Sequence, residues 1–186
     1  NGNSSYDETL DIQTVFVSHD QANRHGGDCV VYNGLTPCET NLTYQRKGFH
    51  FLGKAAWRRK NVRGAICCAR KAKSGKIDIL GGTRLNFNMG FRLTLDRNAR
   101  FHGMVDNSKK YKIMESSRGL VFPVCWNEPF GLAIIESLFS GCPVFGTPYG
   151  SLPELVPPDI GFLSSRSDEL AEAMKDSQQW KPQVCR

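Results

Sequence analysis

The sequence lacks the long apolar runs and repeats that mark membrane and fibrous proteins. No apolar run approaches the roughly 18 residues that a membrane-spanning helix needs, and the 18 Gly and 9 Pro follow no fibrous period. The 186 residues are 40% hydrophobic, and 24 Lys and Arg against 18 Asp and Glu give a net charge of +6. This composition predicts one soluble globular domain. The sequence does not open like a secretory signal, so none is predicted in it.

Disulfide and zinc patterns are also missing. The 7 cysteines are an odd number, and no two of them have C-x-x-C spacing. Free cysteines are typical of reducing compartments, so we expect a cytoplasmic location. Four of them have apolar neighbours and are predicted to be small buried side chains: Cys67, Cys68, Cys125 and Cys142.

Two nucleotide-binding motifs are absent as well. The chain has no G-x-x-x-x-G-K-[ST] phosphate loop, and the Gly81-Gly82 pair does not extend to G-x-G-x-x-G. No pair of carboxylates separated by one residue lies in a plausible loop, and Asp78 stands alone. The sequence therefore predicts neither a dinucleotide-binding loop nor a metal site.

One long stretch lacks acidic residues altogether. The segment Arg46–Lys76 contains many Lys and Arg but no Asp or Glu. Its charge favours an anionic partner: nucleic acid, an anionic membrane surface or a small phosphorylated ligand. Nucleic acid is disfavoured because no interleaved aromatic residues offer a stacking platform. The pattern of Asn61–Ala72 is instead amphipathic, with an inward face of Val62, Ala65, Ile66 and Ala69.

What the chain does have is a regular alternation of short apolar runs and amphipathic stretches. The predicted strands are Thr14–Ser18, Cys29–Tyr32, Phe49–Gly53, Ile77–Leu80, Ala99–His102, Leu120–Val124, Pro143–Phe145 and Ile160–Leu163. The predicted helices are Asn61–Ala72, Lys109–Glu115, Phe130–Ser140 and Asp168–Lys175. Such alternation is typical of an α/β fold with a doubly wound parallel sheet. The segment Thr83–Asn98 fits neither period and is predicted to be a long loop or an irregular hairpin.

Ligands of doubly wound sheets bind where the carboxyl ends of the strands meet. Four segments are predicted to converge at that edge: Gly53–Lys60, Gly81–Arg84, Gly103–Asp106 and Pro123–Gly131. They contain most of the polar residues of interest, so we expect the functional site there.

The most informative element is the helix predicted over Phe130–Ser140. It is apolar nearly all round, which predicts burial, yet Glu136 lies in its middle. A buried carboxylate needs a partner, so ligand hydroxyls, an Arg or a Lys are expected beside it. Pro129 in the first turn would place Glu128 just before the helix and leave free N–H groups as an anion site. The alternative is two unrelated glutamates, with Glu136 in a structural ion pair.

Several blocks of the sequence resemble one enzyme family. Glu128-Pro-Phe-Gly-Leu…Glu136-Ser-Leu…Ser-Gly-Cys-Pro-Val resembles the E-x7-E motif of the retaining nucleotide-sugar glycosyltransferases of family four. Further blocks agree in order: Val31-Tyr-Asn-Gly-Leu35 with an N-G segment, Phe51-Leu-Gly-Lys54…Lys60-Asn61 with a G-R…K-N block, and Phe101-His-Gly-Met-Val105 with an F-x-G-x-V block. The resemblance covers about residues 14 to 175.

The resemblance implies the C-terminal, Rossmann-like domain of the two-domain GT-B fold. Residues 1–27 would be a remnant of the acceptor domain or a linker. Residues 28–176 would form the nucleotide-sugar-binding domain, and residues 177–186 would begin a C-terminal helix.

The resemblance also implies residue roles. Lys60 would grip the diphosphate and neutralise the leaving group, and Glu128 would face the donor sugar, so these two are the predicted catalytic residues. Glu136 would bind the ribose hydroxyls. The other predicted donor-binding residues are Lys54, Arg58, Arg59, Gly82, Gly103, Met104, Val105, Phe130, Gly131 and Leu132.

Within this set, the backbone amides of Gly131 and Leu132 would hold the distal phosphate. The loop Gly103–Val105 would meet the base, and Gly82 would line the sugar pocket. Lys54 stands where the family usually has Arg and lacks its bidentate fork. Arg58 or Arg59 could therefore share the phosphate role.

The implied function is transfer of a sugar from a nucleoside-diphosphate sugar to an acceptor, with retention and without a metal or other cofactor. The acceptor, a sugar, lipid or other small molecule, would bind a missing N-terminal domain, so the isolated chain is expected to bind nucleotide but turn over poorly. The full-length protein could associate peripherally with a membrane. Two alternatives stay open: a non-catalytic nucleotide-sugar-binding module, and another GT-B-like enzyme such as a nucleotide-sugar epimerase.

Three further side chains each allow two interpretations. His19 either belongs to catalytic machinery of the missing domain or caps a turn, and the cap is favoured. Trp57 and Trp126 either cover the bound base or sugar, or pack structurally.

Overall fold

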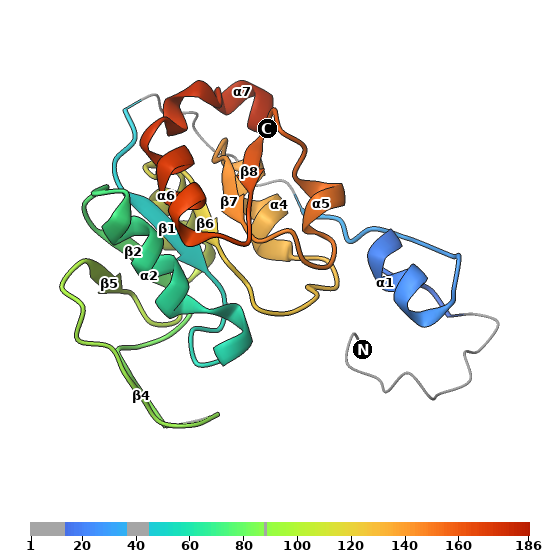
Figure 1. The fold of residues 1–186 in the computed structure, drawn as a ribbon, viewed down its shortest axis with the longest axis horizontal. Coiled ribbons are helices and arrows are strands. Elements are labelled where there is room, and N and C mark those ends of the chain that lie inside the picture. The colour runs from blue at the N-terminus through green and yellow to red at the C-terminus, as the bar shows by residue number, and fades with distance from the viewer. Residues whose placement is uncertain (1–13, 37–44, 88) are drawn as a thin grey trace.

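The computed structural model describes residues 14–36, 45–87 and 89–186. Its centre is a sheet of six parallel strands (Figure 1). These strands are β1 (Phe49–Leu52), β2 (Ile77–Leu80), β5 (Ala99–Phe101), β6 (Leu120–Phe122), β7 (Val144–Gly146) and β8 (Gly161–Leu163). Their order across the sheet is β5-β2-β1-β6-β7-β8, so the chain moves outward from β1 in one direction and from β6 in the other.

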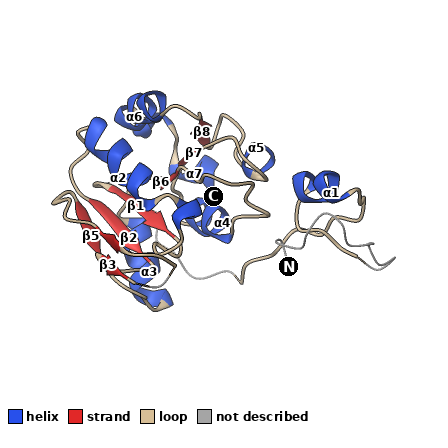
Figure 2. Ribbon diagram, turned by 60° about the horizontal axis from the view of Figure 1, so that its bottom comes forward, coloured by secondary structure: helices blue, strands red, loops and turns tan. Residues whose placement is uncertain are grey.

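Helices cover both faces of the sheet (Figure 2). On one face, α2 (Val62–Lys71) packs beside α6 (Ser167–Lys175), and the opposite face carries α3 (Asn107–Glu115) and α4 (Leu132–Phe139). The remaining helical elements are α1 (His19–His25), α5 (Leu152–Leu155), α7 (Pro182–Cys185) and the 3₁₀ turns η1 (Arg58–Lys60) and η2 (Ser177–Gln179). The predicted doubly wound α/β fold is therefore confirmed.

The core lies between the sheet and its helices. Strands of a parallel sheet are covered on both faces, so nearly every side chain of β1 and β6 is apolar. The largest fully buried side chains include Phe49, Phe51, Phe122 and Phe145, each of which gains about 2–3 kcal/mol from burial. The inward face predicted for α2 is buried as expected.

His50 is a polar exception inside this core. Its ring lies between the Oγ atoms of Ser117, 2.8 Å from Nδ1, and Ser137, 2.9 Å from Nε2. Burial, together with the charge of Arg46, lowers the pKa of His50 to about 3. The neutral imidazole thus joins β1 to α4 by hydrogen bonds.

Element boundaries agree with the sequence within about two residues for the six strands of the sheet. The segment predicted as a loop or hairpin is a hairpin, with β3 (Leu85–Asn86) antiparallel to β4 (Arg92–Leu93). The helix predicted from Phe130 begins at Leu132 instead, because Gly131 adopts a left-handed conformation (φ 89°).

The two strands predicted before residue 33 are wrong. Thr14–Ser18 and Cys29–Tyr32 form only one parallel bridge, between Phe16 and Val30. The chain between them forms the unpredicted helix α1, whose N-cap is Ser18. No sheet covers these apolar runs, and Val15 and Val31 remain exposed.

The prediction of four buried cysteines is only partly right. Cys68 and Cys142 are buried and Cys67 is half-buried, whereas Cys125 is exposed. The backbone of Cys125 leaves the sheet with the loop after β6, where its N–H donates to the Arg59 carbonyl at 2.8 Å. An apolar local sequence therefore did not mean an interior position.

No helix among the described residues is long and apolar enough to cross a bilayer. Residues 1–13 lie outside the described residues, as does Cys38. The domain boundaries at residues 27 and 176 and the cytoplasmic location stay predictions.

Candidate functional site

A cavity of about 450 Å³ opens where the strand order reverses, beside the carboxyl ends of β1 and β6. We call it the switch-point cavity. Its walls come from the loop after β1, the loop after β6, the start of α4, and Val17 and Asn33 of the N-terminal segment. Seven predicted site residues line it: Lys54, Lys60, Glu128, Phe130, Gly131, Leu132 and Glu136.

Lys60 and Glu128 form an ion pair in this cavity. The Nζ atom of Lys60 lies 2.5 Å from Oε2 of Glu128, and the two side chains are only 14% and 8% exposed. The Nε1–H of Trp126 donates to the same oxygen at 3.0 Å. The ammonium also faces the rings of Trp57, Phe122 and Trp126, 5.1–5.8 Å from their centroids. A cation held by one carboxylate and three rings is strongly positioned.

The backbone at Glu128 is fixed by the loop after β7. The N–H of Ser151 donates to the Glu128 carbonyl at 2.9 Å, and its hydroxyl donates to the Phe130 carbonyl at 2.7 Å. A Cβ at Gly150 would lie 2.3 Å from the Glu128 nitrogen, and Gly150 has φ of 65°. Only glycine fits this close approach. Sequence analysis did not predict this contact, which joins residues more than 20 positions apart.

The N-terminus of α4 forms part of the cavity wall. Gly131 is its N-cap, and among the described residues no side chain caps the helix. The first N–H groups of a helix have no intrahelical acceptor and attract anions. Gly131 and Leu132 thus lie at a helix N-terminus on the cavity wall, and the anion site there stays a prediction. Pro129 lies before the helix and not in its first turn as predicted.

Glu136 lies half-buried on the second turn of α4. Its Oε1 accepts a hydrogen bond from Nζ of Lys110 on α3 at 2.7 Å, and these side chains are 18% and 13% exposed. The expected Lys or Arg partner is therefore present. Glu136 also lines the switch-point cavity. Sequence analysis predicted a cation beside Glu136 but did not identify Lys110, because no local pattern links the two residues.

Other predicted residues lie at the same sheet edge but outside this cavity. Gly82 and Gly103 pair in an antiparallel bridge, and a Cβ at Gly82 would lie 2.6 Å from the Ala55 Cβ. Met104 is 88% exposed, whereas Val105 packs against the small cluster of Leu80, Tyr111 and Met114. These residues fix the loops after β2 and β5 beside the cavity.

The two arginines of η1 also point elsewhere. Arg58 lines a neighbouring cavity, and the exposed Arg59 contributes a backbone carbonyl to Cys125. Trp57 and Trp126 both line the switch-point cavity and contact each other, with centroids 4.6 Å apart. Their two interpretations are therefore compatible.

His19 is not part of the cavity. Ser18 is the N-cap of α1, so the favoured assignment of a cap to His19 is wrong. The His19 N–H donates to Oε2 of Glu154 on α5 at 3.1 Å, and Tyr32 contacts Phe130 at 5.8 Å between centroids. These contacts join the N-terminal segment to the cavity rim.

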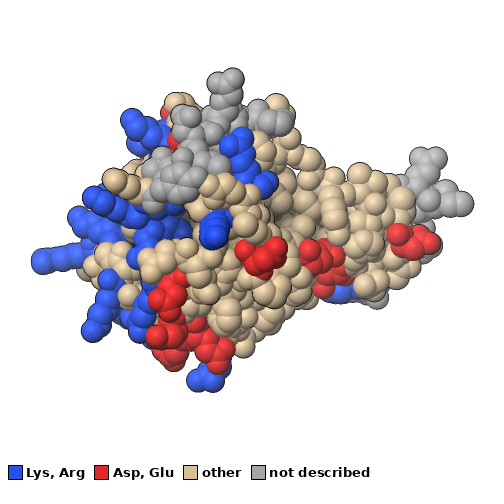
Figure 3. Space-filling model, turned by 90° about the horizontal axis from the view of Figure 1, so that it is seen from above, with Lys and Arg blue, Asp and Glu red and all other residues tan. Residues whose placement is uncertain are grey.

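The surface charge is uneven. Lys and Arg side chains gather at the end of the molecule opposite α1 (Figure 3). Within the described ranges, no three His, Cys, Asp or Glu side chains cluster as metal ligands would. The expectation that no metal is needed stays a prediction.

Three comparisons place these features among known proteins. A family model for glycosyl transferases group 1 matches residues 40–178. A sucrose synthase of Thermosynechococcus vestitus is 30% identical in an alignment of 87 residues that covers 41% of this chain and 11% of that protein.

Solved structures show the same fold. HepE of Anabaena, in complex with UDP, has a TM-score of 0.71 at 20% identity and covers 92% of this chain and 56% of its own. AviGT4, from avilamycin A biosynthesis, has a TM-score of 0.68 at 16% identity, with 92% and 60% covered. The chain thus spans 11–60% of the length of these relatives. The likenesses confirm the Rossmann-like fold of GT-B glycosyltransferase domains.

Proposed function

Because the chain belongs to the glycosyl transferases group 1 family, we propose that it is the donor-binding domain of a family-four enzyme that transfers a sugar with retention. In this proposal it lies C-terminal to an acceptor domain and needs no metal. A nucleoside-diphosphate sugar occupies the switch-point cavity. The acceptor, a sugar, lipid or other small molecule, approaches from the side of the N-terminal segment.

One observation carries the proposal: Lys60 and the uncapped N-terminus of α4 face the same cavity, between Glu128 and Glu136. Two positive features lie side by side, and a carboxylate flanks each of them. A diphosphate joined at one end to a ribose and at the other to a sugar has the matching order of charges and hydroxyls.

The diphosphate would bind between Lys60 and α4. Its charge competes with Glu128 for the ammonium of Lys60, while the amides of Gly131 and Leu132 receive the distal phosphate. Lys54, also at the cavity, adds a point charge. Charge that develops on the leaving phosphate during transfer would be stabilised by groups already in place, which makes a metal dispensable.

The two glutamates would bind the ends of the donor. Glu136 keeps Lys110 on Oε1 and can accept ribose hydroxyls on its cavity side. Glu128 keeps the Trp126 N–H when Lys60 turns to phosphate, and it would face the sugar and the positive charge that grows at its anomeric carbon. The structure of HepE holds UDP-glucose, which supports UDP sugars as the first donors to try.

The test is calorimetric titration of the chain with UDP, GDP, ADP and their common sugar conjugates. We expect one nucleotide to bind selectively. Glu136→Ala removes the acceptor for ribose, and Lys60→Ala removes the diphosphate cation. Each should weaken binding about tenfold or more, the usual effect of losing a charged hydrogen bond.

Lys175→Ala is the matched control, because Lys175 also pairs with a glutamate at 2.5 Å but lies on the far helix α6. It should leave nucleotide binding unchanged. Circular dichroism checks that each variant is folded. If the folded wild-type chain bound none of the nucleotides, the proposal would be contradicted.

A further inference from the structure

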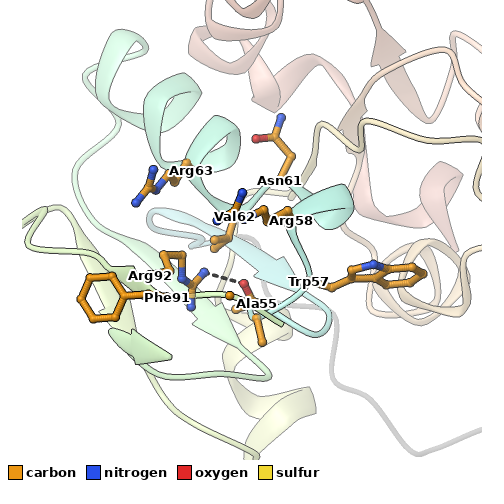
Figure 4. Close-up of a pocket in the computed structure, with 10 residues that line it drawn as sticks. Ala55, Trp57, Arg58, Asn61, Val62, Arg63, Phe91 and Arg92 are labelled. Atoms are coloured by element: carbon orange, nitrogen blue, oxygen red, sulfur yellow. Dashed lines mark hydrogen bonds between the residues drawn. The ribbon is translucent and has the colours of Figure 1, made fainter. Parts of the chain in front are cut away.

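A second cavity, of about 300 Å³, lies between the start of α2 and the β3–β4 hairpin (Figure 4). Three arginines line it: Arg58 from η1, Arg63 from α2 and Arg92 from β4. We call it the arginine cavity. Trp57 lines both cavities, and its ring points away from the arginines in the close-up. The proposed donor function makes no use of this space.

The positive charge of the arginine cavity has no carboxylate to balance it. None of the described residues that line it is acidic. The ion pairs that described arginines make belong to others, namely Arg24, Arg70, Arg100 and Arg166. Two exposed arginines and one buried arginine therefore line one small space with no acidic residue among the described lining residues, which is unusual for the buried one.

Arg92 is the buried member of the three, with only 8% of its surface exposed. Its Nη1 donates to the Ala55 carbonyl at 2.5 Å and its Nη2 to the Thr83 carbonyl at 2.9 Å. Its Nε has no hydrogen-bond partner among the described residues. Burial lowers the pKa of Arg92, and the charge of Arg63 lowers it further. A buried cation with an unpartnered donor can donate a hydrogen bond to an anion.

The N-terminus of α2 adds to this field. The side chain of Asn61 accepts the N–H of Gly64 at 3.0 Å, and the first two residues of the helix, Val62 and Arg63, both line the cavity. A ten-residue helix places a partial positive charge there, independent of the arginine side chains.

We propose that the arginine cavity is a second anion site, separate from the switch-point cavity, that binds the phosphate group of a phosphate ester. Arg58 and Arg63 reach the phosphate from the exposed rim, and Arg92 supplies charge from the inner wall. The apolar side chains of Ala55 and Val62 leave room for the carbon part of the ester. The proposal does not depend on the donor function.

The ester could be carried by a soluble sugar or by a lipid. The outer face of the hairpin exposes Phe87, Phe91 and Leu95, at 71%, 63% and 76%. Such a face suits a lipid-borne phosphate, whereas a sugar phosphate would need only the cavity. Both sources present the same group to the arginines.

The test is a titration of the isotope-labelled full chain, followed residue by residue through its backbone amide signals. The probes are inorganic phosphate, glucose 6-phosphate and, by co-sedimentation, phosphatidylcholine vesicles with and without phosphatidic acid. We expect saturable shifts at Arg63 and at Gly90–Arg92. Arg58→Gln and Arg63→Gln should each weaken binding by about tenfold or more, because each removes a charged donor.

Arg97→Gln is the matched control. Arg97 is an exposed arginine that lies, like Arg92, between β2 and β5, but it does not line the cavity. It should leave the shifts unchanged. Shifts confined to Gly131–Ala133 would place phosphate in the switch-point cavity and overturn the proposal. Equal weakening by Arg97→Gln, or no binding of any probe, would also overturn it. Retention on phosphatidic acid vesicles, lost in Arg63→Gln, identifies the lipid source, and binding of the sugar phosphate alone identifies the soluble one.

Discussion

The two cavities on either side of Trp57 differ in whether their positively charged side chains are paired with carboxylates. In the switch-point cavity, Lys60 is paired with Glu128, and the nearby Glu136 is paired with Lys110. In the arginine cavity, Arg58, Arg63 and Arg92 have no carboxylate among the described lining residues. Lys60 thus has a counter-charge in the first cavity, whereas the arginines of the second have none among the described lining residues.

This difference teaches what each cavity can do. A ligand of the switch-point cavity that binds Lys60 must exchange with an existing ion pair. A ligand of the arginine cavity would relieve repulsion and gain its charge interactions without competition. The comparison therefore predicts opposite responses when one positive charge is removed from each cavity.

The largest effect is expected for Lys60→Ala. This change leaves the Glu128 carboxylate, 8% exposed, with the Trp126 N–H as its remaining hydrogen-bond donor among the described residues. Breaking a buried pair by removing one partner is costly, so the free energy of unfolding should fall by about 3 kcal/mol. Urea denaturation followed by tryptophan fluorescence measures it.

The double variant Lys60→Ala with Glu128→Gln is its control. It removes both charges, so much of the lost stability should return. If the single and double variants were equally unstable, the ion pair would not be what stabilises this cavity.

A smaller effect is expected on acidification, through His50. Its pKa is about 3 in the folded protein and near 6.5 when unfolded, because burial penalises the imidazolium. Between these values only the unfolded chain takes up the proton, so stability is complete above pH 6.5 and falls as the pH falls toward 3. At pH 5 this group should cost about 2 kcal/mol.

The measurement is the free energy of unfolding at pH 7 and pH 5 for the wild type and for His50→Gln. The variant is expected to be less stable at pH 7 but to lose less on acidification, since glutamine does not titrate. Because His50 bonds Ser137 of α4, acid should loosen the switch-point cavity before the arginine cavity. Equal pH slopes in the two proteins would refute this role for His50.

Local sequence predicted the switch-point cavity well. Strand–helix alternation placed the loops after β1 and β6 at one edge, and the residues around Glu128 and Glu136 predicted the helix α4, although it begins two residues after the predicted start. These features depend on residues near one another in the chain, where periodicity and capping rules apply.

The contacts that sequence reasoning missed join distant residues. Lys110 and Glu136 are 26 positions apart, and Arg63 lies 29 positions before Arg92. Charge in a sequence is visible, but the fold alone decides which charges meet. The exposed Cys125 and the lone Phe16–Val30 bridge show the same limit for apolar residues, since burial depends on what covers them.

The smallest predicted effect has the opposite sign to the first. Arg63→Gln removes a like charge that faces the buried Arg92 and breaks none of the ion pairs of the described residues. The free energy of unfolding should rise by about 0.5 kcal/mol at low salt, and the gain should fade at high salt because salt screens the exposed Arg63. Thermal unfolding at two ionic strengths measures this, with Arg97→Gln as the equal change of net charge outside the cavity. If Arg63→Gln lowered the free energy of unfolding, the charge of Arg63 would already be balanced in the wild-type protein. The contrast between the two cavities would then not hold.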